Sequence, residues 1–149
     1  MNNRNVFSVV GCLLALCIGF GGCAGITIST NDGIAIAQPL VSGGLALILR
    51  NNPSYIPIAS KVGADLAALN YSDLTLTGLN AAVNAAVTKE GGDAALGAIL
   101  ASSFDAGLAG YLAAVAESSL SKDPNAQAVL QALGTAITNG ASIAQANPK

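Results

Sequence analysis

"DAALGAILASSFDAGLAGYLAAVAESSL", residues 93–120, is the stretch that decides the fold class, because its apolar residues recur at helical spacing. An α-helix returns to one face every three or four residues. One side of the predicted helix carries the large residues Leu96, Leu100, Phe104, Leu108, Tyr111 and Val115. The other side carries Ala98, Ser102, Asp105, Ala109, Ala113 and Glu117. We expect a central helix that is touched on two sides. A membrane-spanning helix is the alternative for residues 94–116.

Four further helices are predicted around this one. Residues 39–52 are apolar on all sides, which is typical of a buried helix. After the break RNNPSYIP at residues 50–57, the spacing of apolar residues indicates a second helix that ends near Asn70. The third runs from a Thr77 cap to about Lys89, and the last from 123 to 140. The apolar stripes consist of Ala59, Val62, Leu66 and Leu69 in the second helix, Leu79, Val83 and Val87 in the third, and Ala126, Val129, Leu130, Leu133 and Ile137 in the last.

The ends of these helices carry recognisable signals. Gly91 is placed for a left-handed C-cap after the third helix. Asp123 and Pro124 suit the cap and first turn of the last helix, and Asn139-Gly140 predicts its end. Lys61 and Asp65 stand four residues apart, a spacing at which they can pair on the solvent side of one helix. The fold class is therefore predicted to be all-α, a small bundle of four to five helices over residues 39–145 with a tail at 146–149.

The segment ITISTNDGIAIA, residues 26–37, precedes the predicted bundle. It alternates apolar and polar residues before Asn-Asp-Gly, which favours a β-hairpin. An isolated hairpin is marginal in water, so a flexible tether is the alternative. We expect residues 23–38 to be a tether or a hairpin.

Composition excludes several classes of function. The 149 residues include no His, and charged residues make up 9% with a net charge of −2. The six Lys and Arg residues are scattered, so the basic patch of a nucleic-acid-binding protein is missing. Without His there is no Ser–His or Cys–His pair and no imidazole metal site. We expect no enzyme, no cofactor, no metal and no small-molecule substrate.

The N-terminal segment has the layout of a secretory signal peptide. Arg4 and the α-amine form a positive start, and the 13 residues Val6–Ile18 form an uncharged run. Small residues follow, with four glycines among residues 19–25. A retained membrane anchor is the alternative, because the uncharged stretch up to Gly25 is about long enough to span a bilayer. The three cysteines, Cys12, Cys17 and Cys23, all lie in this region.

The tetrapeptide FGGC, Phe20–Cys23, resembles the lipobox of bacterial lipoprotein precursors, with Phe20 where that pattern usually has an aliphatic residue. The resemblance covers residues 1–24 only. It implies a signal peptide at residues 1–22, cleavage before Cys23, and attachment of lipid to that cysteine. Ala24, rather than Asp, then implies sorting to the outer membrane, facing the periplasm. Ordinary cleavage after Ala24 or Gly25 is the competing interpretation.

No set of side chains predicts catalysis. Ser119–Lys122 matches S-x-x-K, but the companion S-D-N and K-T-G elements are missing. Asp93, Asp105 and Glu117 recur every twelve residues and do not share one helical face. We expect Tyr55 and Tyr111 to be half-buried aromatics with a solvated hydroxyl.

Two functional hypotheses follow. The first is a non-catalytic exported envelope lipoprotein that presents a helical domain to a protein partner or a second copy, through the face carrying Ala109 and Ala113. The second is a membrane-active or membrane-embedded small protein, such as a toxin, a lysis or exclusion factor, or an oligomeric pore. The low charge and the helix at residues 93–120, with large residues on one side and small residues on the other, favour the lipoprotein. The Ala/Gly-rich apolar helices favour the membrane-active protein.

Overall fold

The computed structural model describes residues 29–71, 76–115 and 125–148. Within these ranges the chain forms five α-helices, one short 3₁₀ helix and no strand, which confirms the predicted all-α bundle. The elements are α2 (Thr30–Leu49), η1 (Pro53–Tyr55), α3 (Ile56–Ala68), α4 (Leu76–Lys89), α5 (Ala94–Ala114) and α6 (Ala126–Ala146).

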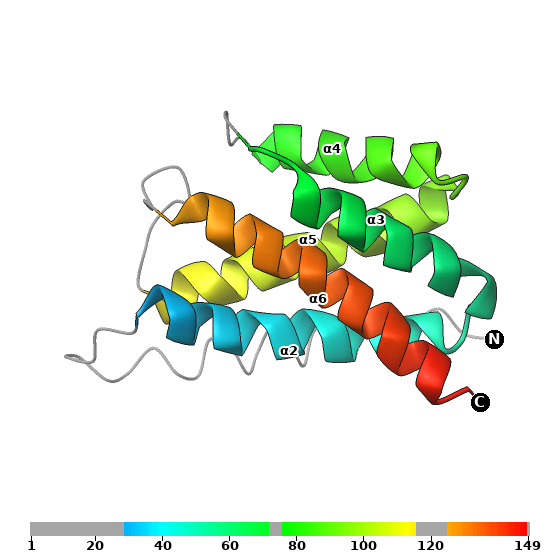
Figure 1. Ribbon diagram of the computed structural model, residues 1–149, viewed down its shortest axis with the longest axis horizontal. Coiled ribbons are helices and arrows are strands. Elements are labelled where there is room, and N and C mark those ends of the chain that lie inside the picture. Colours follow the sequence, from blue (N-terminus) through cyan, green and yellow to red (C-terminus); the bar gives the residue numbers. More distant parts are fainter. Residues whose placement is uncertain (1–28, 72–75, 116–124, 149) are drawn as a thin grey trace.

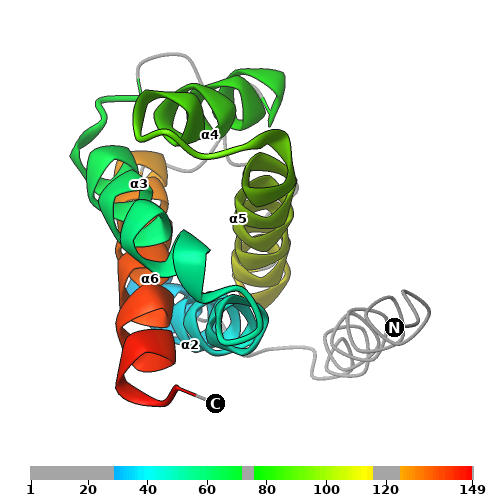
Figure 2. The same ribbon diagram turned by 90° about the vertical axis from the view of Figure 1, so that its right-hand side faces the viewer.

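The helices surround a single core. Helix α6 packs most extensively against α3 and α2, while α5 packs against α2 and α4. In Figure 1, α6 crosses α2 and runs alongside α3. Figure 2 shows α3 and α6 on one side of the core, α5 on the other, and α2 and α4 closing the space between them. The chain therefore brings its first and last described helices into direct contact.

The core is made of the predicted stripes. The large residues of α5 predicted to face inward are buried, except Val115, which is partly buried. The predicted stripes of α4 and α6 are also buried, and in the second predicted helix only Leu69 is exposed. Burying a large aliphatic side chain stabilises a fold by about 1.5–3 kcal/mol. The side chains buried most completely are Tyr111, Phe104, Leu45, Leu49, Leu66, Leu96, Leu100, Leu130, Leu133 and Ile137.

Two glycines allow α3 and α6 to approach closely. A Cβ atom added to Gly134 would lie 2.5 Å from the backbone nitrogen of Ala67 and 3.0 Å from the carbonyl oxygen of Gly63. A Cβ added to Gly63 would lie 2.8 Å from the carbonyl oxygen of Gly134. The two glycines therefore face each other where these helices cross, and neither position has room for a side chain.

The predicted hairpin at residues 26–37 is wrong from Thr30 onward, because those residues begin α2. The Ser29 Oγ accepts a hydrogen bond from the backbone N–H of Asp32 and donates one to its carboxylate. This cap satisfies an N–H that the first helical turn leaves unpaired. Gly33, Ala37 and Val41 then recur every four residues and are all buried. The helix thus begins at Thr30 instead of Pro39, and Pro39 lies within it. Residues 26–28 lie outside the described residues.

The predicted end of the last helix at Asn139-Gly140 is also wrong. Helix α6 continues to Ala146 and buries Gly140, Ala141 and Ala144. A Cβ added to Gly140 would lie 2.9 Å from the carbonyl oxygen of Ser42. This glycine is therefore a contact point between α6 and α2, and residues 141–146, which were expected to follow the helix, continue it.

The turn between α4 and α5 follows the prediction at Gly91, whose φ of 78° lies in the left-handed region. Asp93 caps α5, since its Oδ1 accepts from the backbone N–H of Leu96 at 2.9 Å. Helix α5 ends at Ala114, earlier than the predicted Leu120. Asp123 and Pro124, the predicted start of the last helix, lie outside the described residues, and α6 is described from Ala126.

Candidate functional site

The predicted partner-binding face of α5 is exposed. Ala98, Ser102, Ala109 and Ala113 all lie on the solvent side of the helix. Asp105, which the sequence placed with them, is partly buried against α4. Glu117 lies outside the described residues. No other described helix covers this face.

The neighbours of α5 explain why that face stays free. On one side, a Cβ at Gly107 would collide with Val41 of α2 and Leu133 of α6. On another side, a Cβ at Gly97 would collide with the Asn84 side chain of α4. Gly97 and Gly107 therefore make close contacts with neighbouring helices, whereas Ala98, Ala109 and Ala113 are exposed.

A polar contact lies between α4 and α5. Asn80 Nδ2 donates to Asp105 Oδ2 over 3.4 Å, a long hydrogen bond. The Oδ1 atoms of Asn80 and Asp105 are buried and have no hydrogen-bond partner among the described residues. No group of three or more His, Cys, Asp or Glu residues that could hold a metal ion occurs in the described part of the chain. This contact therefore holds one carboxylate and one amide, which is less than an acid–base pair requires.

The second polar contact joins η1 to the start of α5. The Tyr55 hydroxyl donates to Asp93 Oδ2 over 2.8 Å, and the other oxygen of that carboxylate caps α5. The hydrogen bonds from Leu96 and Tyr55 lower the pKa of Asp93, and the same carboxylate raises the pKa of Tyr55. Both residues therefore serve to position η1 and α5. Tyr55 is half-buried, as predicted, and its hydrogen bond to Asp93 lies at an exposed position. Tyr111 is fully buried, so the prediction of a half-buried aromatic is wrong for that residue.

Tyr71, a residue that the sequence pattern did not indicate, forms a hydrogen bond with the C-terminal end of α3. The Tyr71 hydroxyl donates to the carbonyl oxygen of Leu66, and burial raises its pKa to about 12. Gln127 of α6 donates to the carbonyl oxygen of Leu69 and accepts from the backbone N–H of Tyr71. These bonds attach the segment after α3 to α6.

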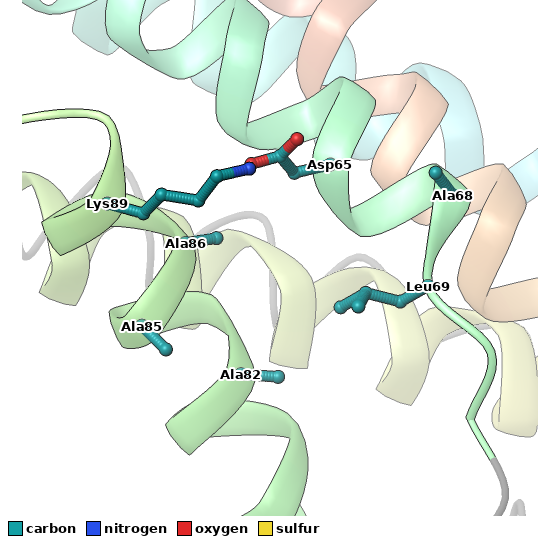
Figure 3. Close-up of a pocket in the computed structure, with 7 residues that line it drawn as sticks. All are labelled: Asp65, Ala68, Leu69, Ala82, Ala85, Ala86 and Lys89. Atoms are coloured by element: carbon teal, nitrogen blue, oxygen red, sulfur yellow. The ribbon is translucent and has the colours of Figure 1, made fainter.

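A shallow groove of about 340 Å³ runs between α3 and α4. Figure 3 shows alanine side chains of α4 on one side of it and the end of α3 on the other, with the Lys89–Asp65 ion pair above. The groove is lined by Asp65, Ala68, Leu69, Ala82, Ala85, Ala86 and Lys89. Its volume is near the lower limit for a small-molecule pocket, and it carries one ion pair as its only charged feature.

The ion pairs beside this groove differ from the predicted one. Lys61 pairs with Glu90 at 3.5 Å, and Lys89 pairs with Asp65 at 2.6 Å. Hydrogen bonding to Asp65 raises the pKa of Lys89. Lys61 and Asp65 therefore contact partners beyond α3 and do not pair with each other within it. Solvent screens such exposed pairs strongly, so they help to orient α4 without dominating the stability.

Two predicted features lie outside the described residues, namely Cys23 and the S-x-x-K stretch Ser119–Lys122. Two described helices, α2 and α5, are long and apolar enough to cross a membrane by length and composition. The core helix of a soluble protein meets the same criterion. Comparison of the chain with known protein families, with characterised proteins and with solved structures gives no match.

Proposed function

We propose that this chain is a non-catalytic lipoprotein of the cell envelope, exported and anchored through Cys23, which presents its helical domain to a protein partner or a second copy. The proposed location is the outer membrane, facing the periplasm, on the basis of Ala24 after the cysteine. The observation that carries the partner-binding role is the exposure of Ala109 and Ala113 on an uncovered side of α5.

The chemistry of this face suits another helix. Ala98, Ser102, Ala109 and Ala113 are small, and their exposed stripe carries no charge. Small side chains let two helix backbones come close, which increases the van der Waals contact along the helices. A partner helix would lose little side-chain entropy on this side, since alanine has no rotamers to restrict.

The lipid-anchor hypothesis makes a prediction about mass. We expect the mature chain to begin at Cys23 and to carry the added mass of acyl chains, because cleavage and acylation occur together at a lipobox cysteine. Intact-mass spectrometry of the protein purified from membranes checks this. The Cys23→Ser variant is the control and should lack both the acyl mass and the cleavage before residue 23. A mature chain that begins at Gly25 or Ile26 without added lipid would contradict the anchor.

The partner hypothesis makes a prediction about Ala109. Because Ala109 is exposed within one chain, Ala109→Glu should leave the fold intact and abolish assembly, since a charge buried in an interface without a partner is strongly unfavourable. Circular dichroism measures the fold, and light scattering measures self-association. A photo-crosslinking residue at position 102 reports contact with a different protein in cells.

The matched control is Ala128→Glu, at an exposed alanine of α6. We expect it to leave both fold and assembly unchanged. If Ala109→Glu also leaves assembly and crosslinking unchanged, the α5 face is only solvent-exposed and the partner role is lost. If Ala109→Glu unfolds the chain, this face is covered within the monomer.

A membrane-embedded protein is the second candidate, and the length and hydropathy of α2 and α5 favour it. The two candidates differ in how the domain leaves the membrane when lipid attachment is blocked. To distinguish the two candidates, a protease site is inserted before residue 23 of the Cys23→Ser variant. Residues 1–22 are then removed by the protease, and the membranes are washed with carbonate. A peripheral domain is released by this wash, whereas an embedded one stays with the membrane.

A further inference from the structure

One side of α2 carries two large apolar side chains that are exposed to solvent and a third that is partly buried. Ile36, Leu40, Gly43 and Leu47 lie on the same side by helical spacing. Ile36 is 44% exposed and Leu47 is 56% exposed, which places them among the most exposed large hydrophobic residues that the structure describes. Leu40 is partly buried where it meets Gly110 of α5. We call Ile36, Leu40 and Leu47 the α2 stripe.

The surroundings of the α2 stripe are uncharged. Residues 33–49 contain no Asp, Glu, Lys or Arg. Charge is found only at the ends of the helix, at Asp32 in its first turn and at Arg50, its C-cap. No ion pair among the described residues includes Arg50. A soluble helix normally places charged residues on its outer side, so α2 departs from that pattern from residue 33 to residue 49.

The neighbouring helix has the same character. Helices α2 and α5 pack against each other, and both are apolar enough to span a membrane. Less than half of the apolar stretch of each helix is buried inside the fold. The low charge therefore extends across the seam between α2 and α5. The other exposed large hydrophobics, Leu69 and Ile143, lie beyond the end of α3 and on α6.

The length of chain before α2 limits how far this helix can lie from a membrane anchor. Residues 24–29 separate Cys23 from Thr30. A fully extended chain covers at most about 3.6 Å per residue, so the start of α2 lies within about 25 Å of a lipid on Cys23. Helix α2 has 20 residues, which corresponds to a length of about 30 Å. An anchor at Cys23 therefore keeps the start of α2 within reach of the bilayer surface, and α2 is short enough to lie along that surface from this point.

The shape of the stripe favours lipid over a second protein. Gly43 and Gly44 interrupt it between Leu40 and Leu47, and a Cβ at either glycine would meet nothing within 4 Å. A rigid partner would need a matching side chain to fill this gap, since a void costs packing energy. Fluid acyl chains and lipid headgroups adapt to such a surface without a matched side chain.

We propose that α2 lies along the surface of the bilayer, with Ile36, Leu40 and Leu47 inserted at the boundary between headgroups and acyl chains. The proposal rests on the lipid anchor at Cys23 proposed above. A helix in this position buries its apolar side at the interface and keeps its other side on the protein core.

The experiment places one fluorescent reporter at a time on the mature lipoprotein. Acylation of Cys23 leaves an introduced cysteine as the only free thiol, so Leu47→Cys and Ile36→Cys can each be labelled with an environment-sensitive fluorophore. Ile143→Cys is the matched control, because Ile143 is as exposed as Ile36 but lies on α6. Each labelled protein is reconstituted in vesicles of phosphatidylethanolamine and phosphatidylglycerol. Brominated lipid quenches reporters in the bilayer, and iodide quenches those in water.

At positions 36 and 47 we expect emission at shorter wavelength, loss of fluorescence with brominated lipid, and protection from iodide. At position 143 we expect quenching by iodide alone. Circular dichroism confirms that each labelled protein is folded.

Three other results would overturn the proposal. Quenching by iodide at position 47 would place the stripe in water. Protection from both quenchers would mean that a protein covers it. Equal lipid quenching at 47 and 143 would mean that the whole domain is immersed. The intact mass of the same preparation reports separately whether Cys23 is acylated. If it is not, the same cysteine variants are prepared in a chain that begins at Ala24, so that the introduced cysteine is again the only thiol, and the labelled chain is added to vesicles from outside before the quenching at 36 and 47 is read. Failure of the anchor is thereby distinguished from failure of the membrane contact.

Discussion

Replacing Gly134 by alanine is expected to destabilise the protein by about 3 kcal/mol, the upper part of the usual range for overpacking. The added Cβ would lie 2.5 Å from the backbone nitrogen of Ala67 and 2.9 Å from its Cα. Backbone atoms inside a helix cannot move aside as a flexible side chain can. Relief of the clash therefore requires α3 and α6 to separate, and their contact is the most extensive in the fold. Urea denaturation followed by circular dichroism measures the change.

Gly43→Ala is the matched control for Gly134→Ala. Gly43 also lies within a long helix, but a Cβ there would meet nothing within 4 Å. We expect this variant to gain about 0.5–1 kcal/mol, because alanine loses less backbone entropy than glycine on forming a helix. Opposite signs for the two substitutions would support the crossing of α3 and α6. Stabilisation by both would show that these helices are not in close contact at Gly134.

Replacing Leu133 by alanine is expected to cost about 2–5 kcal/mol, the range for deletion of a buried leucine side chain. Leu133 is 1% exposed, and its Cδ2 atom occupies the space beside Gly107 of α5. Its loss would leave a cavity where α6 meets α5. Thermal or urea unfolding of the full mature chain gives the change in free energy.

Leu47→Ala is the leucine control, since this side chain is mostly exposed. In detergent-free solution with acylation blocked, we expect a change within about 0.5 kcal/mol, as is usual for surface substitutions. Gln131→Ala, at an exposed position two residues before Leu133, should behave in the same way. Similar losses at positions 133 and 47 would mean that the outer side of α2 is covered by protein in solution, which would also contradict its assignment to the membrane.

The sequence predicted helices and their buried residues correctly where a long segment has a clear helical spacing of apolar residues. The large residues of α5 and α6 recur at helical spacing, and their burial follows from that spacing for almost all of them. Gly91 could be placed in the left-handed conformation because a helix had to stop there. The prediction for residues 26–37 failed because Asn31-Asp32-Gly33 suits both a hairpin turn and the first turn of a capped helix. The choice between them depends on whether Gly33 can pack against Tyr111 and Val115, which are far away in the sequence.

The candidate surfaces show the same division. The small side of α5 could be predicted, because its alanines and glycines are visible in the periodic pattern. The spacing could not predict which of those small residues contact neighbouring helices. Gly107 and Gly97 are buried against α2, α6 and α4, whereas Ala109 and Ala113 are exposed. The groove between α3 and α4 and the stripe on α2 both went unpredicted. A helix that is apolar on every side gives no periodic signal of which side will be covered.

What the sequence by itself determined is therefore the helical class of this chain, most of its inward-facing residues and the resemblance of residues 1–24 to a lipoprotein signal. These depend on local spacing and on short motifs. Only the tertiary structure decided that Gly140 continues a helix, that Gly63 and Gly134 form a crossing, and that Lys61 and Asp65 pair beyond their own helix. Each of these outcomes depends on how closely another segment approaches, and that distance is set by the packing of side chains far apart in the sequence.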